Sequence, residues 1–78
     1  MFRYSICTCA DADIYRKQCK AIEKNIPFKR KEPELADVDG SLAQIYTSEN
    51  GRIIVHNSAY YNEVFVESEF DLLPFFSK

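Results

Sequence analysis

The clearest pattern in the chain is a helical one after residue 11. At about 100° per residue, the apolar side chains of this segment gather in one arc and the basic side chains in the opposite arc. Asp11 and Asp13 supply an N-cap and a first-turn carboxylate, and Ile26-Pro27 ends the helix because the residue before a proline disfavours helical geometry. We therefore predict an amphipathic helix to about Asn25. Its apolar arc holds Ile14, Tyr15, Cys19, Ile22 and Ile26, and its basic stripe holds Arg16, Lys17, Lys20 and Lys24.

Runs rich in β-branched and aromatic residues predict four strands. The first covers residues 2–9, directly before the helix. Two more, residues 42–47 and 52–56, flank a turn signal, and partial alternation predicts the fourth strand over residues 60–67. Residues 28–41 contain proline and glycine without a sustained period, so we expect a long loop there.

The turn between the second and third strands is predicted to be a tight hairpin. Asn50-Gly51 at its tip favours the positive φ angles of a type I′ turn. Pairing outward from that turn sets the expected register of the two strands. It places Glu49 opposite Arg52, Tyr46 opposite Val55 and Ile45 opposite His56.

The C-terminal segment predicts one more short element. Ser68 and Asp71 have the spacing of a helix-capping box, and Pro74 limits the helix after them to one or two turns. The predicted element order is β-α-β-β-β-α. We therefore expect an α+β fold in a single domain of residues 1–78: an antiparallel β-sheet of about four strands, with one amphipathic helix packed on a face and a short C-terminal helix.

Composition narrows the class of protein. A chain that is 46% hydrophobic and 14% aromatic is too apolar for a disordered one. No apolar run approaches the roughly 20 residues of a membrane span, and the first residues lack the pattern of a secretion signal. We expect a cytoplasmic protein without membrane contact. The odd number of cysteines, three, then predicts free thiols rather than a disulfide framework.

The charge is distributed unevenly along the chain. The net charge is −2, but residues 1–31 carry eight Lys or Arg against three Asp or Glu, and residues 32–78 carry two against nine. The acidic part is suited to a basic surface on a partner protein, where complementary charge speeds encounter and selects the partner. The alternative is that these acids serve solubility alone.

Two cysteines stand close together before the helix. Cys7 and Cys9 lie on one side of a strand with Cα atoms about 6.6 Å apart, near the upper limit for a disulfide. A helix N-terminus directly after Cys9 stabilises a thiolate. Together with Lys24-Asn25-Ile26-Pro27-Phe28 after the helix, the hairpin, and Phe70-Asp71-Leu72-Leu73, this arrangement resembles a glutaredoxin, whose own motif is Cys-x-x-Cys or a single N-terminal cysteine. The resemblance implies a thiol redox protein using Cys9; the simpler alternative is that the cysteines are small core residues.

The residue pattern does not favour a metal site or a catalytic site. A zinc site would need Cys7, Cys9, Cys19 and His56 to converge, and the usual paired Cys-x₂₋₄-Cys spacing is missing. The chain has one histidine and no glycine-rich phosphate loop. We therefore predict a protein that is not an enzyme and uses no metal or cofactor.

The basic stripe allows a nucleic-acid hypothesis. Extended by Lys29-Arg30-Lys31, it is suited to follow phosphates with a salt-dependent attraction. A solvated helix face is commonly charged in any case, and the acidic half of the chain would repel the same polymer. Nucleic-acid binding is therefore an alternative to protein binding.

The leading hypothesis is a small protein-binding module, a monomer or homodimer. It resembles in kind the phage- or bacterium-encoded inhibitors of the anti-defence or immunity type, which block a partner surface through charged and aromatic contacts. The predicted partner-binding residues are Tyr60, Tyr61, Glu63, Glu67 and Glu69 on one surface, and Lys20, Lys24, Arg30 and Lys31 on another.

Overall fold

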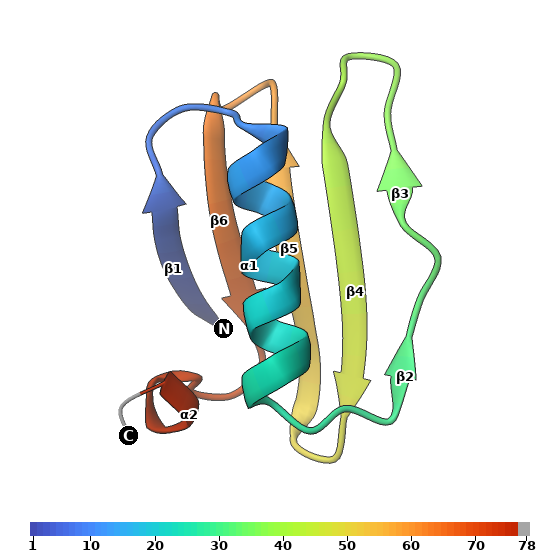
Figure 1. Cartoon of the computed structure of the whole chain (residues 1–78), viewed down its shortest axis with the longest axis vertical. Helices are drawn as coiled ribbons and strands as arrows, with labels where there is room; N and C mark the ends of the chain where they lie inside the picture. The colour runs from blue at the N-terminus through green and yellow to red at the C-terminus, as the bar shows by residue number, and fades with distance from the viewer. Residues whose placement is uncertain (77–78) are drawn as a thin grey trace.

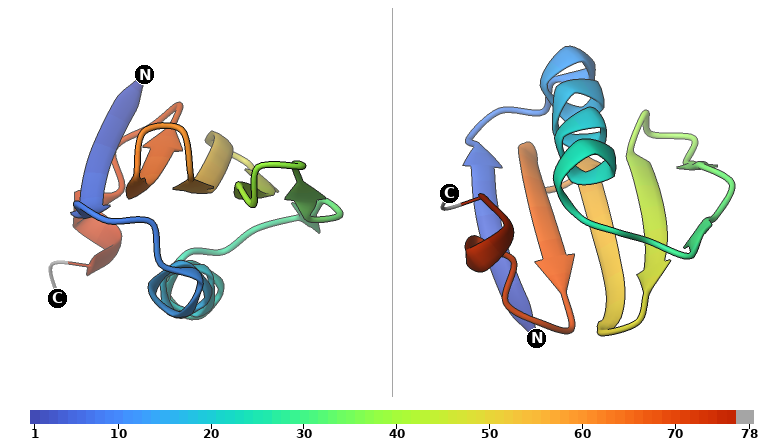
Figure 2. Two further views of the ribbon diagram at one scale, coloured as in Figure 1. Left: turned by 90° about the horizontal axis from the view of Figure 1, so that it is seen from above. Right: turned by 60° about the horizontal axis from the view of Figure 1, so that its bottom comes forward.

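The computed structural model describes residues 1–76 as an antiparallel sheet of six strands with two helices, an α+β fold. Helix α1 crosses one face of the sheet, and α2 lies on the same side, close to β1 (Figures 1 and 2). The predicted α+β class and the two helices are confirmed. The elements are β1 Phe2–Cys7, α1 Ala12–Asn25, β2 Arg30–Lys31, β3 Leu35–Ala36, β4 Leu42–Ser48, β5 Gly51–Ser58, β6 Glu63–Ser68 and α2 Leu73–Phe76.

The number of strands differs from the prediction. The sheet order is β1-β6-β5-β4-β2, and β3 also pairs with β4. Residues 28–41, expected to be a loop, run along β4, where the Lys29 N–H donates to the Thr47 carbonyl and the Glu32 N–H to the Ile45 carbonyl. All four predicted strands are present, but β2 and β3 add two more, so the expected order β-α-β-β-β-α is only roughly matched. Strands of two residues are too short to show an alternation of apolar and polar positions.

The hairpin of β4 and β5 forms where predicted, but its register differs by two residues. Such an even shift keeps every side chain on the face that the predicted register gave it. The observed pairs are Ser48 with Gly51, Thr47 with Arg52, Tyr46 with Ile53, Ile45 with Ile54 and Ala43 with His56.

The turn of this hairpin is also of another type. Gly51 has a positive φ of 135°, whereas Glu49 and Asn50 do not, so the type I′ turn was a wrong prediction. The Ser48 hydroxyl holds the observed turn: it donates to the Gly51 carbonyl at 2.9 Å and accepts from the Asn50 N–H at 3.3 Å. This local side-chain contact shifts the turn by one residue relative to Asn50-Gly51.

Helix α1 has the predicted cap and the predicted buried face. The Asp11 carboxylate accepts hydrogen bonds from the N–H groups of Asp13 and Ile14, at 2.9 and 3.2 Å. The helix ends at Asn25, and the apolar arc faces the sheet. Tyr15, Cys19, Ile22 and Ile26 are buried in the core, and Ile14 is half-buried beside them.

Two tyrosine hydroxyls connect α1, β4 and the segment before it. The Tyr46 hydroxyl donates to Glu23 at 2.6 Å, and the Tyr15 hydroxyl donates to Glu34 at 2.8 Å. Burial raises the pKa of both tyrosines, so both remain hydrogen-bond donors. The hydrogen bond from Tyr46, reinforced by Lys31 at 3.0 Å, lowers the pKa of the Glu23 carboxyl. These contacts hold the edge of the sheet near β2 and β3 against the helix.

Two strands have ends that differ from the prediction. Strand β1 stops at Cys7, two residues early, and its pairing with β6 is interrupted by a bulge between Ser5 and Cys7. Strand β6 begins only at Glu63, so Tyr60 and Tyr61 lie in the turn before it. This turn contains Asn62 with a φ of 51°, a conformation that ends the strand pairing.

The C-terminal helix is capped by Asp71 instead of Ser68. The Asp71 carboxylate accepts from the Leu73 N–H at 3.1 Å and from the Tyr4 hydroxyl at 2.8 Å, and that hydroxyl in turn accepts from the Leu72 N–H. Ser68 accepts a hydrogen bond from the Phe70 N–H before the helix begins. Because Leu72 is buried, this cap fixes α2 against β1.

The two glycines with positive φ provide a test of the hairpin. A Cβ at Gly51 would lie 2.8 Å from the Cβ of Glu69, whereas a Cβ at Gly40, with a φ of 91°, meets nothing within 4 Å. We expect Gly40→Ala to cost about 1–2 kcal/mol of unfolding free energy from backbone strain alone. Gly51→Ala should cost about 1–3 kcal/mol more because of the clash. Urea unfolding of both variants measures the difference, and equal losses would contradict the described packing of Glu69.

Candidate functional site

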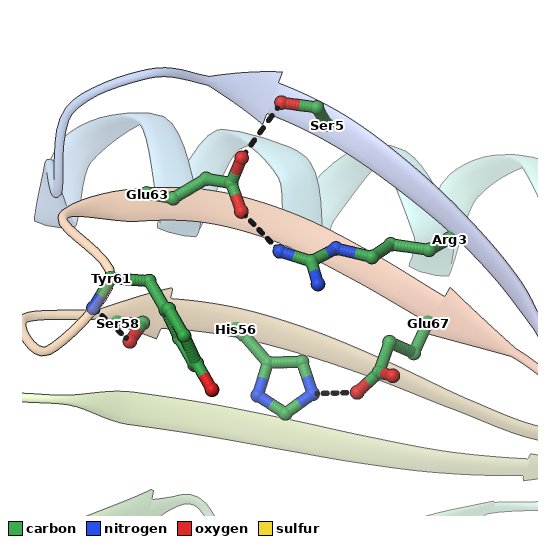
Figure 3. Close-up of polar contacts among 7 residues, drawn as sticks. All are labelled: Arg3, Ser5, His56, Ser58, Tyr61, Glu63 and Glu67. Carbon is green, nitrogen blue, oxygen red and sulfur yellow. Dashed lines mark hydrogen bonds and ion pairs between the residues drawn. The ribbon is translucent and has the colours of Figure 1, made fainter.

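The sheet face opposite to α1, here called the outer face, carries a polar network around one aromatic side chain (Figure 3). Alternation along each strand sends every second residue to this face. No helix formed by residues 1–76 covers it (Figure 2). Its central residues are Arg3, Ser5, Ile45, Ile54, His56, Ser58, Glu63, Phe65 and Glu67.

Phe65 is buried on the outer face although no second layer of secondary structure packs there. Its ring is stacked by the His56 imidazole, with centroids 4.4 Å apart and planes at 14°. The Arg3 guanidinium lies 4.2 Å from the ring centroid, within the range of a cation–π contact. Only 6% of Phe65 stays exposed. Two polar side chains therefore take the place of the apolar layer that would normally cover such a ring.

Glu63 orients one of these two covering groups. Its carboxylate accepts a hydrogen bond from the Arg3 guanidinium and another from the Ser5 hydroxyl at 3.1 Å (Figure 3). The side chain of Glu63 is only 22% exposed, whereas that of Arg3 is 51% exposed. Glu63, predicted as a partner-binding residue, thus lies on the surface but is engaged within the sheet.

Glu67 has the same relation to the other covering group. Its Oε1 lies 2.9 Å from Nε2 of His56, an ion-pair distance that lacks the alignment of a hydrogen bond, and Nε2 is otherwise without a partner among residues 1–76. Burial lowers the pKa of His56; Glu67 opposes this shift and Arg3 adds to it. His56 is therefore neutral at physiological pH and stacks on Phe65 as an uncharged ring.

Tyr60 and Tyr61 stand at the end of the outer face. They are 83% and 66% exposed and meet edge to face, with ring centroids 5.0 Å apart. The Tyr61 N–H donates to the Ser58 hydroxyl at 3.0 Å, and its ring extends along β5 toward His56 (Figure 3). Of the first predicted set, the structure thus brings Tyr61, Glu63 and Glu67 to one face, with Tyr60 beside them.

Glu69 does not join this group. It follows β6 at the opposite end from the tyrosines, where its carboxylate accepts from the Arg52 N–H at 2.6 Å and lies 3.6 Å from the Arg52 guanidinium. Its Cβ also packs against Gly51. Glu69 therefore closes the hairpin of β4 and β5 and is separated from the predicted contact surface by the length of β6.

The second predicted set is divided between the two faces and is partly neutralised: Lys20, Lys24 and Lys31 lie on the helix side of the sheet, whereas Arg30 pairs with Thr47 and points to the outer face. Lys31 pairs with Glu23 at 3.0 Å, and Arg30 lies 3.1 Å from Glu32. Lys20 and Lys24 are exposed on α1 and have no carboxylate within 4.0 Å among the described residues. Lys29, Arg30 and Lys31 therefore add less positive potential to the basic stripe than their sequence suggests.

The cysteines are distributed between core and surface. Cys9 is exposed, Cys7 is half-buried at the end of β1, and Cys19 is buried in α1, where burial raises the pKa of its thiol. The N-terminus of α1 after Cys9 is occupied by the carboxylate of Asp11. The redox hypothesis based on Cys9 stays a prediction. Within residues 1–76, no group of three or more His, Cys, Asp or Glu side chains is placed to hold a metal ion.

Arg3, Ser5 and Phe65 were missed as site residues. Their signal was the period of two in Arg3-x-Ser5 and Glu63-x-Phe65-x-Glu67, which places these side chains on a common face once the two strands pair. That β1 pairs with β6, some 60 residues away, is a property of the sheet order.

The comparisons with known proteins do not extend this description. No protein-family model, curated protein or solved structure matches the chain significantly. Among the helices formed by residues 1–76, none has the length and apolar character needed to cross a membrane.

The lowered pKa of His56 predicts how stability depends on pH. The unfolded chain takes up a proton on His56 near pH 6.5, before the folded chain does, so protonation favours unfolding. The contribution of neutral His56 is present above about pH 6.5 and is lost as the pH falls toward the lower folded pKa. We expect His56→Gln to weaken the dependence of unfolding free energy on pH between about pH 7.5 and pH 5.5, because the carboxyl groups titrate at lower pH. Urea unfolding at a series of pH values measures both slopes; parallel slopes would contradict the described environment of His56.

Proposed function

We propose that this chain is a small protein-binding module whose outer face and adjoining tyrosine pair occupy a surface of a partner protein, in the manner of an inhibitor of the anti-defence or immunity type. The observation that carries the proposal is the pair Tyr60 and Tyr61. These two rings are 83% and 66% exposed at the end of a sheet face that no described helix covers. Large aromatic rings exposed beside an ordered face are typical anchors of protein interfaces.

The side chains of the outer face are already held in place, which supports this proposal. Arg3, Glu63, His56 and Glu67 are already held by one another and by Phe65, so little side-chain freedom remains to be lost on binding. Ile45 and Ile54 are half-buried beside this network and offer apolar area to a partner. An interface commonly combines such an apolar centre with a polar rim.

The charges of the outer face favour recognition through the tyrosines over recognition through the glutamates. The carboxylate of Glu63 pairs with Arg3 within the sheet, so it offers a partner less free negative charge than the sequence suggests, whereas Glu67 faces the neutral His56 and keeps its charge. Reversing the charge of Glu63 or Glu67 would place a cation beside Arg3 or His56 and disturb the packing of these two side chains on Phe65. The tyrosines are therefore the cleaner residues to test, because both are exposed and a substitution removes no core contact.

We expect Tyr60→Ala with Tyr61→Ala to weaken partner binding by about tenfold or more while the melting temperature changes little. The partner is first isolated from a lysate of the native host with the tagged protein and identified by mass spectrometry. Its affinity for the wild-type protein and the double variant is then measured with purified components by calorimetry.

The matched control is Leu73→Ala with Phe76→Ala. These two apolar residues are also exposed, at 56% and 41%, but they belong to α2 on the helix side of the sheet, away from the outer face. We expect this control to bind like the wild-type protein. Equal affinities for the wild type and the tyrosine variant would refute the outer-face proposal.

A further inference from the structure

Strand β1 is a free edge of the sheet. It pairs with β6 on one side only, and among the described residues no strand lies on its other side (Figure 1). Alternate backbone N–H and C=O groups of an edge strand point outward and offer hydrogen bonds to an additional strand. Soluble proteins usually protect such an edge with proline or lysine. Strand β1 has neither, and the side chain of its one charged residue, Arg3, lies over Phe65 on the outer face.

An apolar groove lies beside this edge on the helix side of the sheet. It arises because α1 is set toward the middle of the sheet and leaves a space between itself, β1 and α2 (Figure 2). The groove has a volume of about 300 Å³. Its walls are Tyr4 and Ile6 from β1, Gln18 and Ala21 from α1, Val66 from β6, and Leu72, Leu73 and Phe76 from the C-terminal segment.

Three of these residues are apolar and well exposed. Ile6 is 39% exposed, Leu73 is 56% exposed and Phe76 is 41% exposed. Ile6 sits in the bulge between Ser5 and Cys7, where an extra residue in one strand lets its side chain take a new direction, here toward the groove. The bulge thus connects the free edge and the groove in one site.

The geometry of a sheet determines what fits this site. A strand added about 4.8 Å from β1 would send every second side chain to the helix side, over the groove, and the others to the outer side. Backbone hydrogen bonds to β1 would then supply affinity, and the groove would select the alternate side chains. An extended peptide with apolar residues at every second position has this form.

The charges around the site favour an acidic strand. On the outer side, the added residues would lie next to Ser5 and next to Arg3, whose guanidinium is half exposed and also pairs with Glu63. On the helix side, Lys17 and Lys24 lie within one turn of Ala21 in the groove wall, and neither has a carboxylate within 4.0 Å among the described residues. Asp71, which directly precedes the groove residue Leu72, accepts hydrogen bonds from the Tyr4 hydroxyl and the Leu73 N–H.

A second copy of this chain is a poorer occupant. Its β1 would bring another Arg3 and no carboxylate to the edge, because residues 2–7 contain no Asp or Glu. We therefore propose that the edge of β1 and the adjoining groove bind an extended segment of another protein, with apolar side chains facing the groove and carboxylates between them. This site is separate from the outer face and does not depend on the function proposed above.

Selection from a randomised heptapeptide library displayed on phage tests the proposal with the full chain as bait. We expect the recovered peptides to alternate apolar residues with Asp or Glu. Bound to the isotopically labelled protein, a synthetic peptide of the recovered sequence should slow amide exchange in β1 and leave exchange in β2 unchanged. Recovery of no binder, of basic peptides, or of peptides that protect another element would overturn the proposal.

Peptide binding by the variant Leu73→Asp tests whether the peptide occupies the groove, and Leu35→Asp is the control. The two leucines are almost equally exposed, at 56% and 57%, and an acidic residue is favourable in the first turn of α2, so both variants should fold. We expect Leu73→Asp to weaken peptide binding about tenfold or more and Leu35→Asp to change it less than about twofold. Equal effects of the two substitutions would contradict a site at the groove.

Three further measurements separate the remaining outcomes. Lys17→Glu with Lys24→Glu should reduce the affinity and its dependence on salt, because both lysines contribute to the attraction of an acidic strand. Sedimentation of the protein alone tests self-association: a dimer that Leu73→Asp dissociates would assign the edge to a second copy and overturn the proposal. The variant Tyr60→Ala with Tyr61→Ala should bind the peptide normally, which distinguishes this site from the outer face.

Discussion

A single long helix, α1, packs on a sheet that is much wider than the helix. Strands lie about 4.8 Å apart, so the five strand positions from β1 to β2 extend over about 20 Å, whereas a helix with its side chains is about 10 Å across. Helix α1 therefore covers roughly two strands on one face and none on the other. The remaining features of the structure follow from this mismatch between the area of the sheet and the area that α1, the only long helix among residues 1–76, can bury.

The protein deals with the uncovered area in three ways. Beside β4, the hydroxyls of Tyr15 and Tyr46 reach carboxylates and hold the edge strands to the helix. Beside β1, the short helix α2 closes part of the gap and leaves an apolar groove. On the outer face, Arg3 and His56 cover Phe65, so that its aromatic ring is removed from water without a second layer. The second of these leaves the groove, and the third leaves the outer face, as the two surfaces on which the proposals above are based.

These surfaces change how the charged residues should be interpreted. Glu63, Glu67 and Glu69 are acidic residues on the surface, but each contacts a basic group of the same chain. Their first task is to fix Arg3, His56 and the β4-β5 hairpin. Exposed ion pairs contribute little stability by themselves, and the His56 ring opposite Glu67 is neutral, so the importance of these contacts lies in the geometry that they give to their neighbours. In the binding modes proposed above, recognition of a partner therefore depends more on exposed aromatic and apolar side chains than on the acidic residues.

The sequence by itself determined the elements that depend on local physics. The N-cap at Asp11, the buried face of α1 around Ile22 and the position of the hairpin were all predictable, because helix periodicity, capping and strand propensity act between residues close in the chain. It also predicted Tyr60, Tyr61, Glu63, Glu67 and Glu69 as partner-binding residues, and all of these except Glu69 lie on or beside the outer face. Tertiary structure alone decided that β1 pairs with β6, that residues 28–41 run along β4, and that Arg3 meets Phe65. These contacts join residues far apart in the chain, and their free energy depends on which strands become neighbours, which no local pattern records.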